Sequence, residues 1–150
     1  MNILRVLTEK RKIGNFGENA AAKYLKRHGY RILCRSYVAL ENEIDIIARN
    51  KDTLAFIEVK TRSVQSDNGF ESRPSASVTH EKQGKIIRAA KCFLTSAKYN
   101  KRLAGLRARL DVIEVYIENT KNKRLVKEII HMEGAFKENN ELHKHTKFKR

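Results

Sequence analysis

The segment from Asn42 to Lys60, NEIDIIARNKDTLAFIEVK, constrains the fold of this chain most, because it predicts two β-strands around a turn. Its strands nevertheless carry charged residues among the apolar ones. Alternate strand residues share a face, so Glu43 and Asp45 point one way, while Glu58 and Lys60 share a face on the second strand. A turn with an even number of loop residues would place Asp45 opposite Glu58 and Glu43 opposite Lys60. An odd number would place the two sets on opposite faces of the sheet.

Two facing carboxylates in this hairpin would need a compensating partner. Directly paired residues have Cβ atoms about 4.5 to 5.5 Å apart, and like charges at that distance destabilise a sheet. A divalent cation would reverse this penalty, because carboxylate and carbonyl oxygens with water form the ligand shell that Mg²⁺ prefers. The alternative is that Glu58 only pairs with Lys60 on an exposed sheet face. The E-x-K pattern alone does not decide between these interpretations.

A helix is predicted before the hairpin, over residues 14–29, where small and apolar residues recur at helical spacing. Gly29 suits its left-handed cap. Glu18 shares the apolar stripe of Ala21 and Leu25, so we expect its carboxylate to point toward the core. A second interpretation is that Glu18 only stabilises the start of the helix through the helix dipole. The first interpretation would bring a further carboxylate to the same sheet.

The rest of the chain completes an α/β order of elements. Thr79 can cap a helix whose inward apolar stripe includes Ile86. Gln83, three residues before Ile86, lies on the same side of the helix in its first turn. Gln83 would hold a water or phosphate, or make an ordinary hydrogen bond. We expect strands over 30–40, 107–118 and 124–131, a surface loop over 61–77, one domain over 1–136 and a basic, poorly ordered tail over 137–150.

The charge balance predicts a polyanionic partner. The 150 residues include 32 Lys and Arg against 17 Asp and Glu, giving a formal net charge of +15. Nucleic acid is the first expectation for so basic a chain. No segment has the length of a membrane span and the N-terminal apolar run is too short for a signal peptide, so we expect a cytoplasmic protein without a membrane partner. Cys34 and Cys92 have neither a zinc-ligand spacing nor a disulfide framework.

The order of a helical Glu, a strand Asp and then IEVK resembles the PD-(D/E)xK nuclease superfamily, which has the restriction-endonuclease-like fold. Within it, six segments are similar to successive motifs of the YraN family of uncharacterised proteins, relatives of archaeal Holliday junction resolvases. The resemblance extends from about Ile13 to Phe136. The segments are FGENAAAKYLKRHGYRIL, ENEIDIIA, FIEVKTR, KQGKIIRAA, RLDVIEV and IIHMEGAF.

The resemblance implies an αβββαβ core with a mixed β-sheet flanked by helices. It also implies that four residues match the metal-and-lysine site of the superfamily, and that two more, Glu43 and Gln83, match positions of the narrower family. The four are Glu18, Asp45, Glu58 and Lys60. One departure is Asn42, which stands where the narrower family usually has glycine before EID.

The sequence therefore predicts metal-assisted hydrolysis of phosphodiester bonds in DNA, including branched or structured DNA, with Mg²⁺ or Mn²⁺ as cofactor. The predicted catalytic residues are Asp45, Glu58, Lys60 and Glu18, and the predicted metal ligands are Asp45, Glu58, Glu18 and Glu43. The predicted nucleic-acid contacts are Arg62, Lys82, Gln83, Lys85 and Arg88.

Several alternatives remain open at this level. Arg62 and Lys82 would equally suit solvated surface positions, and Asp111 is expected to be a structural hydrogen-bonding residue. A symmetric substrate would favour a homodimer. The alternative function is a nucleic-acid-binding module or scaffold that keeps the nuclease fold without turnover.

Overall fold

The computed structural model describes residues 2–64, 78–96 and 101–137. Helix α1 spans Ile3–Arg27 and is followed by three consecutive strands. Helix α2 and two more strands complete the described order. The elements after α1 are β1 (Arg31–Ala39), β2 (Asn42–Asn50), β3 (Thr53–Ser63), α2 (His80–Thr95), β4 (Arg107–Asn119) and β5 (Arg124–Met132).

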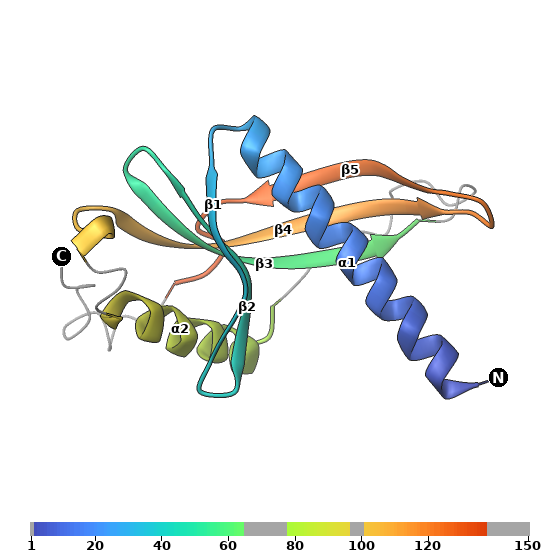
Figure 1. Ribbon diagram of the computed structural model, residues 1–150, viewed down its shortest axis with the longest axis horizontal. Coiled ribbons are helices and arrows are strands. Elements are labelled where there is room, and N and C mark those ends of the chain that lie inside the picture. The colour runs from blue at the N-terminus through green and yellow to red at the C-terminus, as the bar shows by residue number, and fades with distance from the viewer. Residues whose placement is uncertain (1, 65–77, 97–100, 138–150) are drawn as a thin grey trace.

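The five strands form one mixed sheet in the order β1-β2-β3-β4-β5. Neighbouring strands are antiparallel except β3 and β4, which run parallel and are connected through α2. A parallel pair needs such a crossover because its strands start at the same end of the sheet. Figure 1 shows α1 lying diagonally across the sheet, with its first turns extending beyond the strands. This arrangement confirms the predicted αβββαβ core with a mixed sheet flanked by helices.

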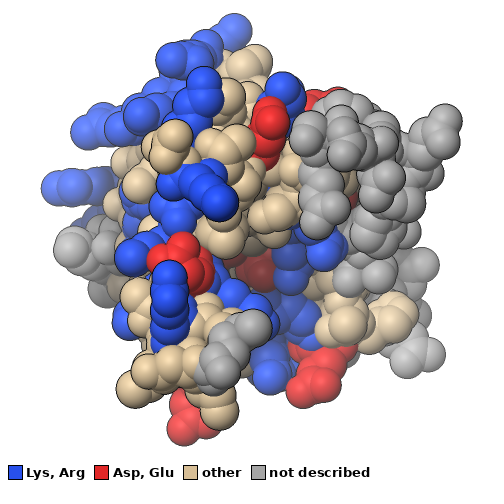
Figure 2. All heavy atoms as spheres, turned by 90° about the vertical axis from the view of Figure 1, so that its right-hand side faces the viewer, with Lys and Arg blue, Asp and Glu red and all other residues tan. Residues whose placement is uncertain are grey.

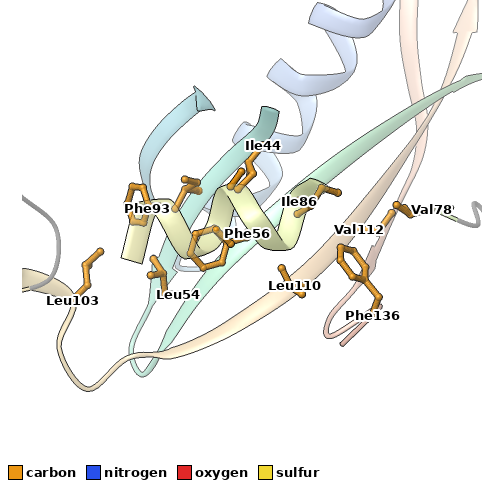
Figure 3. Close-up of a cluster of buried hydrophobic side chains, with 13 residues drawn as sticks. Ile44, Leu54, Phe56, Val78, Ile86, Phe93, Leu103, Leu110, Val112 and Phe136 are labelled. Atoms are coloured by element: carbon orange, nitrogen blue, oxygen red, sulfur yellow. The ribbon is translucent and has the colours of Figure 1, made fainter. Parts of the chain in front are cut away.

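The helices cover opposite faces of the sheet, because alternate residues of the central strands pack into two separate clusters. On one face, Phe56 of β3 packs with Ile86 and Phe93 of α2, and the rings of Phe56 and Phe93 meet edge to face with centroids 5.8 Å apart (Figure 3). On the other face, Ile57 packs with Leu25 of α1. Both faces of β3 are therefore buried, which explains its nearly continuous apolar sequence.

The turn between β2 and β3 confirms the even loop on which the facing carboxylates depended. Asn50 pairs with Thr53, so the loop consists of the two residues Lys51 and Asp52. The pairing continues regularly to Ile46 and Ile57. Asp45 and Glu58 therefore occupy the next position on each strand.

The largest difference from the sequence prediction is the start of α1. The helix begins at Ile3 instead of Gly14, and the side chain of Asn2 caps it by accepting a hydrogen bond from the Leu4 N–H at 3.0 Å. The N-terminal turns bury none of their apolar residues completely, so their sequence lacks the periodicity of a core-facing helix. Gly29 ends the helix with a positive φ of 82°, and Thr79 caps α2, both as predicted.

The predicted loop over residues 61–77 is only partly described. Thr61 to Ser63 extend β3, and residues 65–77 lie outside the described residues. The tail after Lys137 also lies outside them, so its predicted disorder stays a prediction.

Gly17 sets how closely α1 approaches the sheet. A Cβ atom at this position would lie 1.8 Å from Oγ1 of Thr61 in β3, far inside any real contact. The helix and strand therefore touch through backbone and a threonine side chain. Glu18 follows directly, so this contact determines where its carboxylate lies.

We expect Gly17→Ala to lower the free energy of unfolding by about 1 to 3 kcal/mol, because overpacking a close contact forces the helix away from the strand. Gly14→Ala is the matched control, since a Cβ at Gly14 meets nothing within 4 Å. That substitution should stabilise the helix by about 1 kcal/mol. Urea unfolding of both variants measures the difference, and equal effects at the two glycines would contradict the close approach.

Candidate metal and phosphate site

The strands β2 and β3 separate at Asp45, and this fork is the centre of the candidate site. Their regular pairing ends at Ile46 and Ile57, and beyond it the Val59 N–H donates to Oδ2 of Asp45 at 2.7 Å. A side-chain carboxylate thus replaces the backbone acceptor expected in a ladder. The Asp45 carboxylate is therefore held between the two strands and not on one face of a continuous sheet.

The strand alternation is also broken at this point. Ile44 and Ile47 both pack in the cluster beneath α2, whereas Ile46 packs beneath α1. On the neighbouring strand β1, Ser36 has a φ of 51°, an unusual value for a residue other than glycine. The irregular backbone lies between regular pairs, Arg35 with Ile46 and Tyr37 with Ile44. A local kink in both strands therefore accompanies the fork.

Glu58 is the most deeply buried carboxylate of the predicted site, with 5% of its surface exposed. Its Oε1 lies 3.4 Å from Nζ of Lys60 and 3.8 Å from Nζ of Lys82. Its Oε2 is buried and accepts no hydrogen bond from any described residue. An unsatisfied buried carboxylate oxygen is costly, so this atom is suited to a ligand that brings positive charge.

Negative charges accumulate around the fork. Burial, together with the charge of Glu58, raises the pKa of Asp45 to about 7. Burial and the charge of Asp45 also raise the pKa of Glu18, although Arg35 lies 3.7 Å from its Oε2 and opposes the shift. The carboxylates of Glu18, Asp45 and Glu58 therefore form a chain of repelling neighbours, with Asp45 in the middle.

The structure does not bring every predicted residue into this arrangement. Glu43 is exposed and is not paired with Lys60, because the regular pairing of β2 with β3 ends at Ile46 and Ile57. Glu43 pairs with Val38 of β1, and Lys60 pairs with Glu114 of β4. The predicted pairing of Glu43 with Lys60 required a continuous β2–β3 ladder, and the two strands separate before these residues. Glu43 still acts at a distance, because its charge contributes to the raised pKa values of Asp45 and Glu18.

The predicted phosphate contacts divide into two groups. Lys82 reaches Glu58 and so belongs to the site, and the Nε of Arg62 is buried with no hydrogen-bond partner among the described residues. Gln83 is turned away and donates from Nε2 to the carbonyl of Val78 at 2.8 Å, the ordinary hydrogen bond that was one of its two interpretations. Lys85 forms an ion pair with Glu81 at 3.4 Å, and Arg88 is exposed farther along α2.

The sequence interpretation missed two groups near the fork. Arg35 contacts Glu18 and also donates from Nη1 to Oδ1 of Asn19 at 2.9 Å. Glu114 is 4% exposed, and its carboxylate accepts a hydrogen bond from the hydroxyl of Tyr116. Glu114 carried a recognisable signal, because a carboxylate interrupts an apolar strand there as Glu58 does. Arg35 carried none, because its position depends on the kink at Ser36.

Lysines and arginines gather around recessed acidic side chains on one face of the molecule. Figure 2 shows this face, with blue side chains bordering a hollow in which red atoms lie. The site shows the same arrangement at close range, because the ammonium groups of Lys60 and Lys82 both form ion pairs with the buried carboxylate of Glu58. Such a surface attracts a polyanion while keeping carboxylates at its centre.

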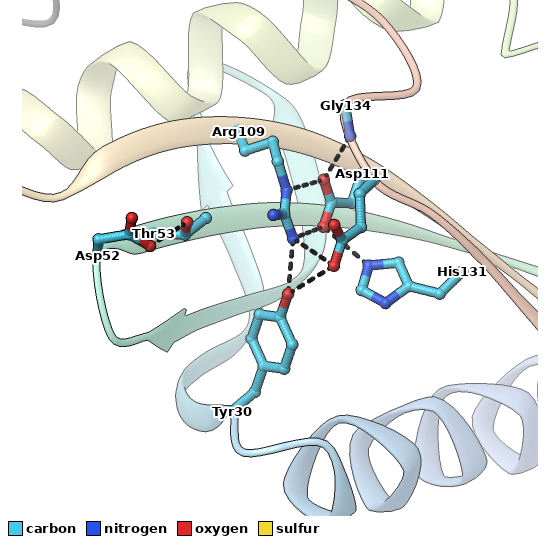
Figure 4. A network of polar contacts seen from close by, with 8 residues as sticks. Tyr30, Asp52, Thr53, Arg109, Asp111, His131 and Gly134 are labelled. Atoms are coloured by element: carbon cyan, nitrogen blue, oxygen red, sulfur yellow. Dashed lines mark hydrogen bonds and ion pairs between the residues drawn. The ribbon is translucent and has the colours of Figure 1, made fainter.

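Asp111 belongs to a separate network on the α1 face of the sheet (Figure 4). It accepts two hydrogen bonds from Arg109, at 2.8 and 2.9 Å, and one from the Gly134 N–H at 2.9 Å. Nε2 of His131 lies 2.8 Å from its Oδ2, and the Tyr30 hydroxyl lies 2.6 Å from Nη2 of Arg109. Asp111 is fully buried with these partners, which confirms the structural role expected for it.

Comparison with known proteins places the chain in a family. The model of the uncharacterised protein family UPF0102, also called the YraN family, matches residues 17–115. The chain belongs to this family. UPF0102 proteins of Desulfosudis oleivorans and Chlorobium phaeobacteroides are 44% identical over 110 residues and 41% identical over 125 residues. The matches cover 73% and 83% of this chain, and 83% and 92% of those proteins.

A third UPF0102 protein, from Alkaliphilus oremlandii, is 44% identical over 126 residues, which are 84% of this chain and 98% of that protein. The family match includes Glu18, Asp45, Glu58 and Lys60, and it covers the whole of β2 and β3, which form the fork. Among the described helices, none is long and apolar enough to cross a membrane.

The donors of this UPF0102 site fit a hard divalent cation. Within residues 2–64, 78–96 and 101–137, no three Asp, Glu, His or Cys side chains converge into one ready-made metal site. Mg²⁺ does not require such a cage, because it usually binds one or two carboxylates and keeps several waters or substrate phosphates. Asp45 and the unsatisfied Oε2 of Glu58 provide two oxygen ligands of the right kind.

Proposed function

We propose that this UPF0102 protein is a metal-dependent nuclease that hydrolyses phosphodiester bonds in DNA. The observation that carries the proposal is the carboxylate of Glu58, whose Oε2 is buried and unsatisfied while its Oε1 lies within ion-pair distance of Lys60 and Lys82. The charge of Glu58 also helps to raise the pKa of Asp45 beside it. A protein that only binds nucleic acid needs a basic surface, but it does not need carboxylates buried beneath that surface. Their repulsion is a cost that a cation would remove.

Asp45 and Glu58 would hold Mg²⁺ or Mn²⁺, and Glu18 would contribute from the side of α1. A bound ion of this kind neutralises phosphate charge and lowers the pKa of the attacking water. The Val59 N–H orients the Asp45 carboxylate, because it fixes one of the two oxygens. The hydrogen bond thereby leaves the second oxygen of Asp45 available for coordination.

Lys60 would act on the reacting phosphate. Its ammonium is positioned by Oε1 of Glu58 and keeps about a third of its side chain exposed, so a phosphate oxygen or a water can reach it. There it would orient the water or stabilise negative charge that develops in the transition state. Lys82 and Arg62 would bind neighbouring phosphates, which gives affinity without sequence recognition.

The experiment is a cleavage assay with purified protein on labelled duplex, nicked duplex, flap, four-way junction and single-stranded DNA. We expect cleavage of at least one form with Mg²⁺ or Mn²⁺ and none with chelator. Binding should weaken steeply with salt, because each neutralised phosphate releases counterions. Binding without cleavage of any form, with either metal, would favour the non-catalytic binding module. A lack of binding at low salt would refute both functions.

A further inference from the structure

The turn between β1 and β2 exposes two large apolar side chains close to the candidate site. Leu40 is 69% exposed and Val38 is 63% exposed. Leu40 and Glu41 are the two central residues of this turn, since Ala39 pairs with Asn42 across it. In Figure 1 the turn projects from the sheet beside the first turns of α2. An exposed leucine at a projecting tip contributes no buried apolar surface to the stability of the fold.

The backbone of this turn is strained for the residues that it contains. Leu40 has a φ of 51° and Glu41 a φ of 61°. Two successive positive φ values are typical of hairpin turns occupied by Asn and Gly, whereas residues with bulky side chains are destabilised in this conformation. A leucine at this position therefore costs stability twice, through its exposure and through its backbone.

A side-chain hydrogen bond and core packing nevertheless hold the tip in place. Asn42 is buried, and its Nδ2 donates to the carbonyl of Leu40 at 2.8 Å. Below the tip, Ala39, Tyr37 and Ile44 pack against the core cluster of α2, where the rings of Tyr37 and Phe93 meet edge to face. A fixed apolar point, unlike a mobile loop, can be pressed into a partner without a further loss of conformational entropy.

The position of the tip indicates its partner. Asp45 follows Asn42 by three strand residues, so the base of the turn lies about 10 Å along β2 from the fork, and Leu40 lies just beyond that base. A nucleic acid whose phosphate reaches the fork would therefore meet Leu40 a few bases away. Apolar side chains inserted between base steps unstack them, and the cost is lowest where stacking is already broken.

We infer that Leu40 is a wedge that inserts between bases and directs the protein to DNA with a break in base stacking, such as a branch, nick or mismatch. This inference rests on the proposed function, because it needs nucleic acid at the fork. Val38 would line the same side of the opened stack. Discrimination would then come from the shape of the substrate and not from its sequence.

The test uses two substitutions in the same turn, both of which relieve the backbone strain. Leu40→Asn removes the apolar tip and suits a positive φ, while Glu41→Gly relieves the strain and keeps Leu40. Each variant, and the wild type, is titrated in chelator against a four-way junction and an intact duplex of equal length. The junction carries 2-aminopurine at its branch point, so that unstacking raises fluorescence.

We expect the wild type and Glu41→Gly to prefer the junction by about tenfold or more and to raise the fluorescence. Leu40→Asn should fold at least as stably, bind the intact duplex unchanged and lose most of the preference and the fluorescence rise. A preference that survives Leu40→Asn, or a wild type that binds both substrates equally, would overturn the wedge but leave the nuclease proposal intact. A wild type that binds neither substrate would refute the wedge and the proposed function together.

Discussion

Asp45→Asn should reduce metal-dependent cleavage by about a hundredfold or more, because it removes a charged ligand from the fork while keeping the size of the side chain. Binding to nucleic acid should remain or become tighter, since one negative charge near the phosphate is lost. The amide oxygen can still accept the Val59 N–H hydrogen bond. Single-turnover cleavage and a binding titration in chelator measure the two quantities separately.

Lys60→Ala is the matched variant for this experiment. It should also abolish cleavage, but Mn²⁺ should bind it about as well as the wild type, because Lys60 contacts Glu58 and would act on the phosphate. Asp45→Asn should instead weaken Mn²⁺ binding in a calorimetric titration. If both variants cleave as the wild type does, the activity belongs to a contaminant or to another site.

Asp45→Asn should raise the stability of the metal-free protein, although it lowers cleavage. Burial and the charge of Glu58 raise the pKa of Asp45 from 3.8 to about 7, so the folded protein holds this proton more tightly than the unfolded chain. The stability that Asp45 contributes is therefore complete below about pH 4 and is lost as the pH rises through 7. Without metal, Asp45→Asn should raise the Tm at pH 8, and the gain should shrink toward pH 4.

Asp111→Asn should strongly destabilise the protein, by about 3 kcal/mol at pH 7 or a fall in Tm of roughly 10 °C. Burial alone would raise the pKa of Asp111, but hydrogen bonds from His131, Arg109 and the Gly134 N–H lower it below 3.8. An asparagine would present an N–H₂ group to these donors and leave the Arg109 charge without its carboxylate. Thermal unfolding at neutral pH measures the loss.

The pH dependence distinguishes this effect from a simple packing defect. Because the folded pKa of Asp111 is depressed, its contribution is complete above about pH 4 and is lost as the pH falls through the folded pKa. The difference in Tm between the wild type and Asp111→Asn should therefore narrow in acid. A constant difference from pH 7 to pH 3 would contradict the role of the ionised carboxylate. The two Asp→Asn variants should thus shift stability in opposite directions at pH 8.

The parts of the site that depend on local rules were predictable from sequence. A two-residue turn fixes the register of a hairpin, so the neighbouring positions of Asp45 and Glu58 followed from parity. The inward direction of Glu18 followed in the same way from helical spacing. Thr79 and Gly29 act as caps because their side-chain and backbone chemistry suits those positions wherever they occur.

The fork itself was not predictable, because it results from a competition between a side chain and the backbone. The parity argument assumes that the β2–β3 ladder continues. The ladder instead ends where the Asp45 carboxylate accepts the hydrogen bond of the Val59 N–H. Because the ladder ends there, Glu43 does not pair with Lys60 as parity had predicted. The contact between Arg35 and Glu18 is equally non-local, since it joins β1 to α1 beside a kink that no sequence pattern marks.

The first turns of α1 were missed for a different reason. Ile3, Leu4 and Leu7 are all largely exposed, so the apolar residues of this segment do not describe a face that packs on the sheet. Within the described part of the chain, an ion pair between Glu9 and Arg124 of β5, at 3.1 Å, connects these turns with the strands. Helical turns that bury so little apolar surface leave little pattern in their sequence.

The hydrogen bond from the Val59 amide to Asp45 also makes the backbone of β3 sensitive to the chemical state of the fork. A carboxylate is a stronger acceptor than a protonated acid, and an ion that draws electron density from Asp45 weakens the same bond. Because Val59 lies between Glu58 and Lys60, which share a face of β3, we expect a change in that bond to shift both of their side chains. Binding of a cation at the proposed site would thus alter the central strand, and the Val59 amide proton is the signal that NMR spectroscopy would follow.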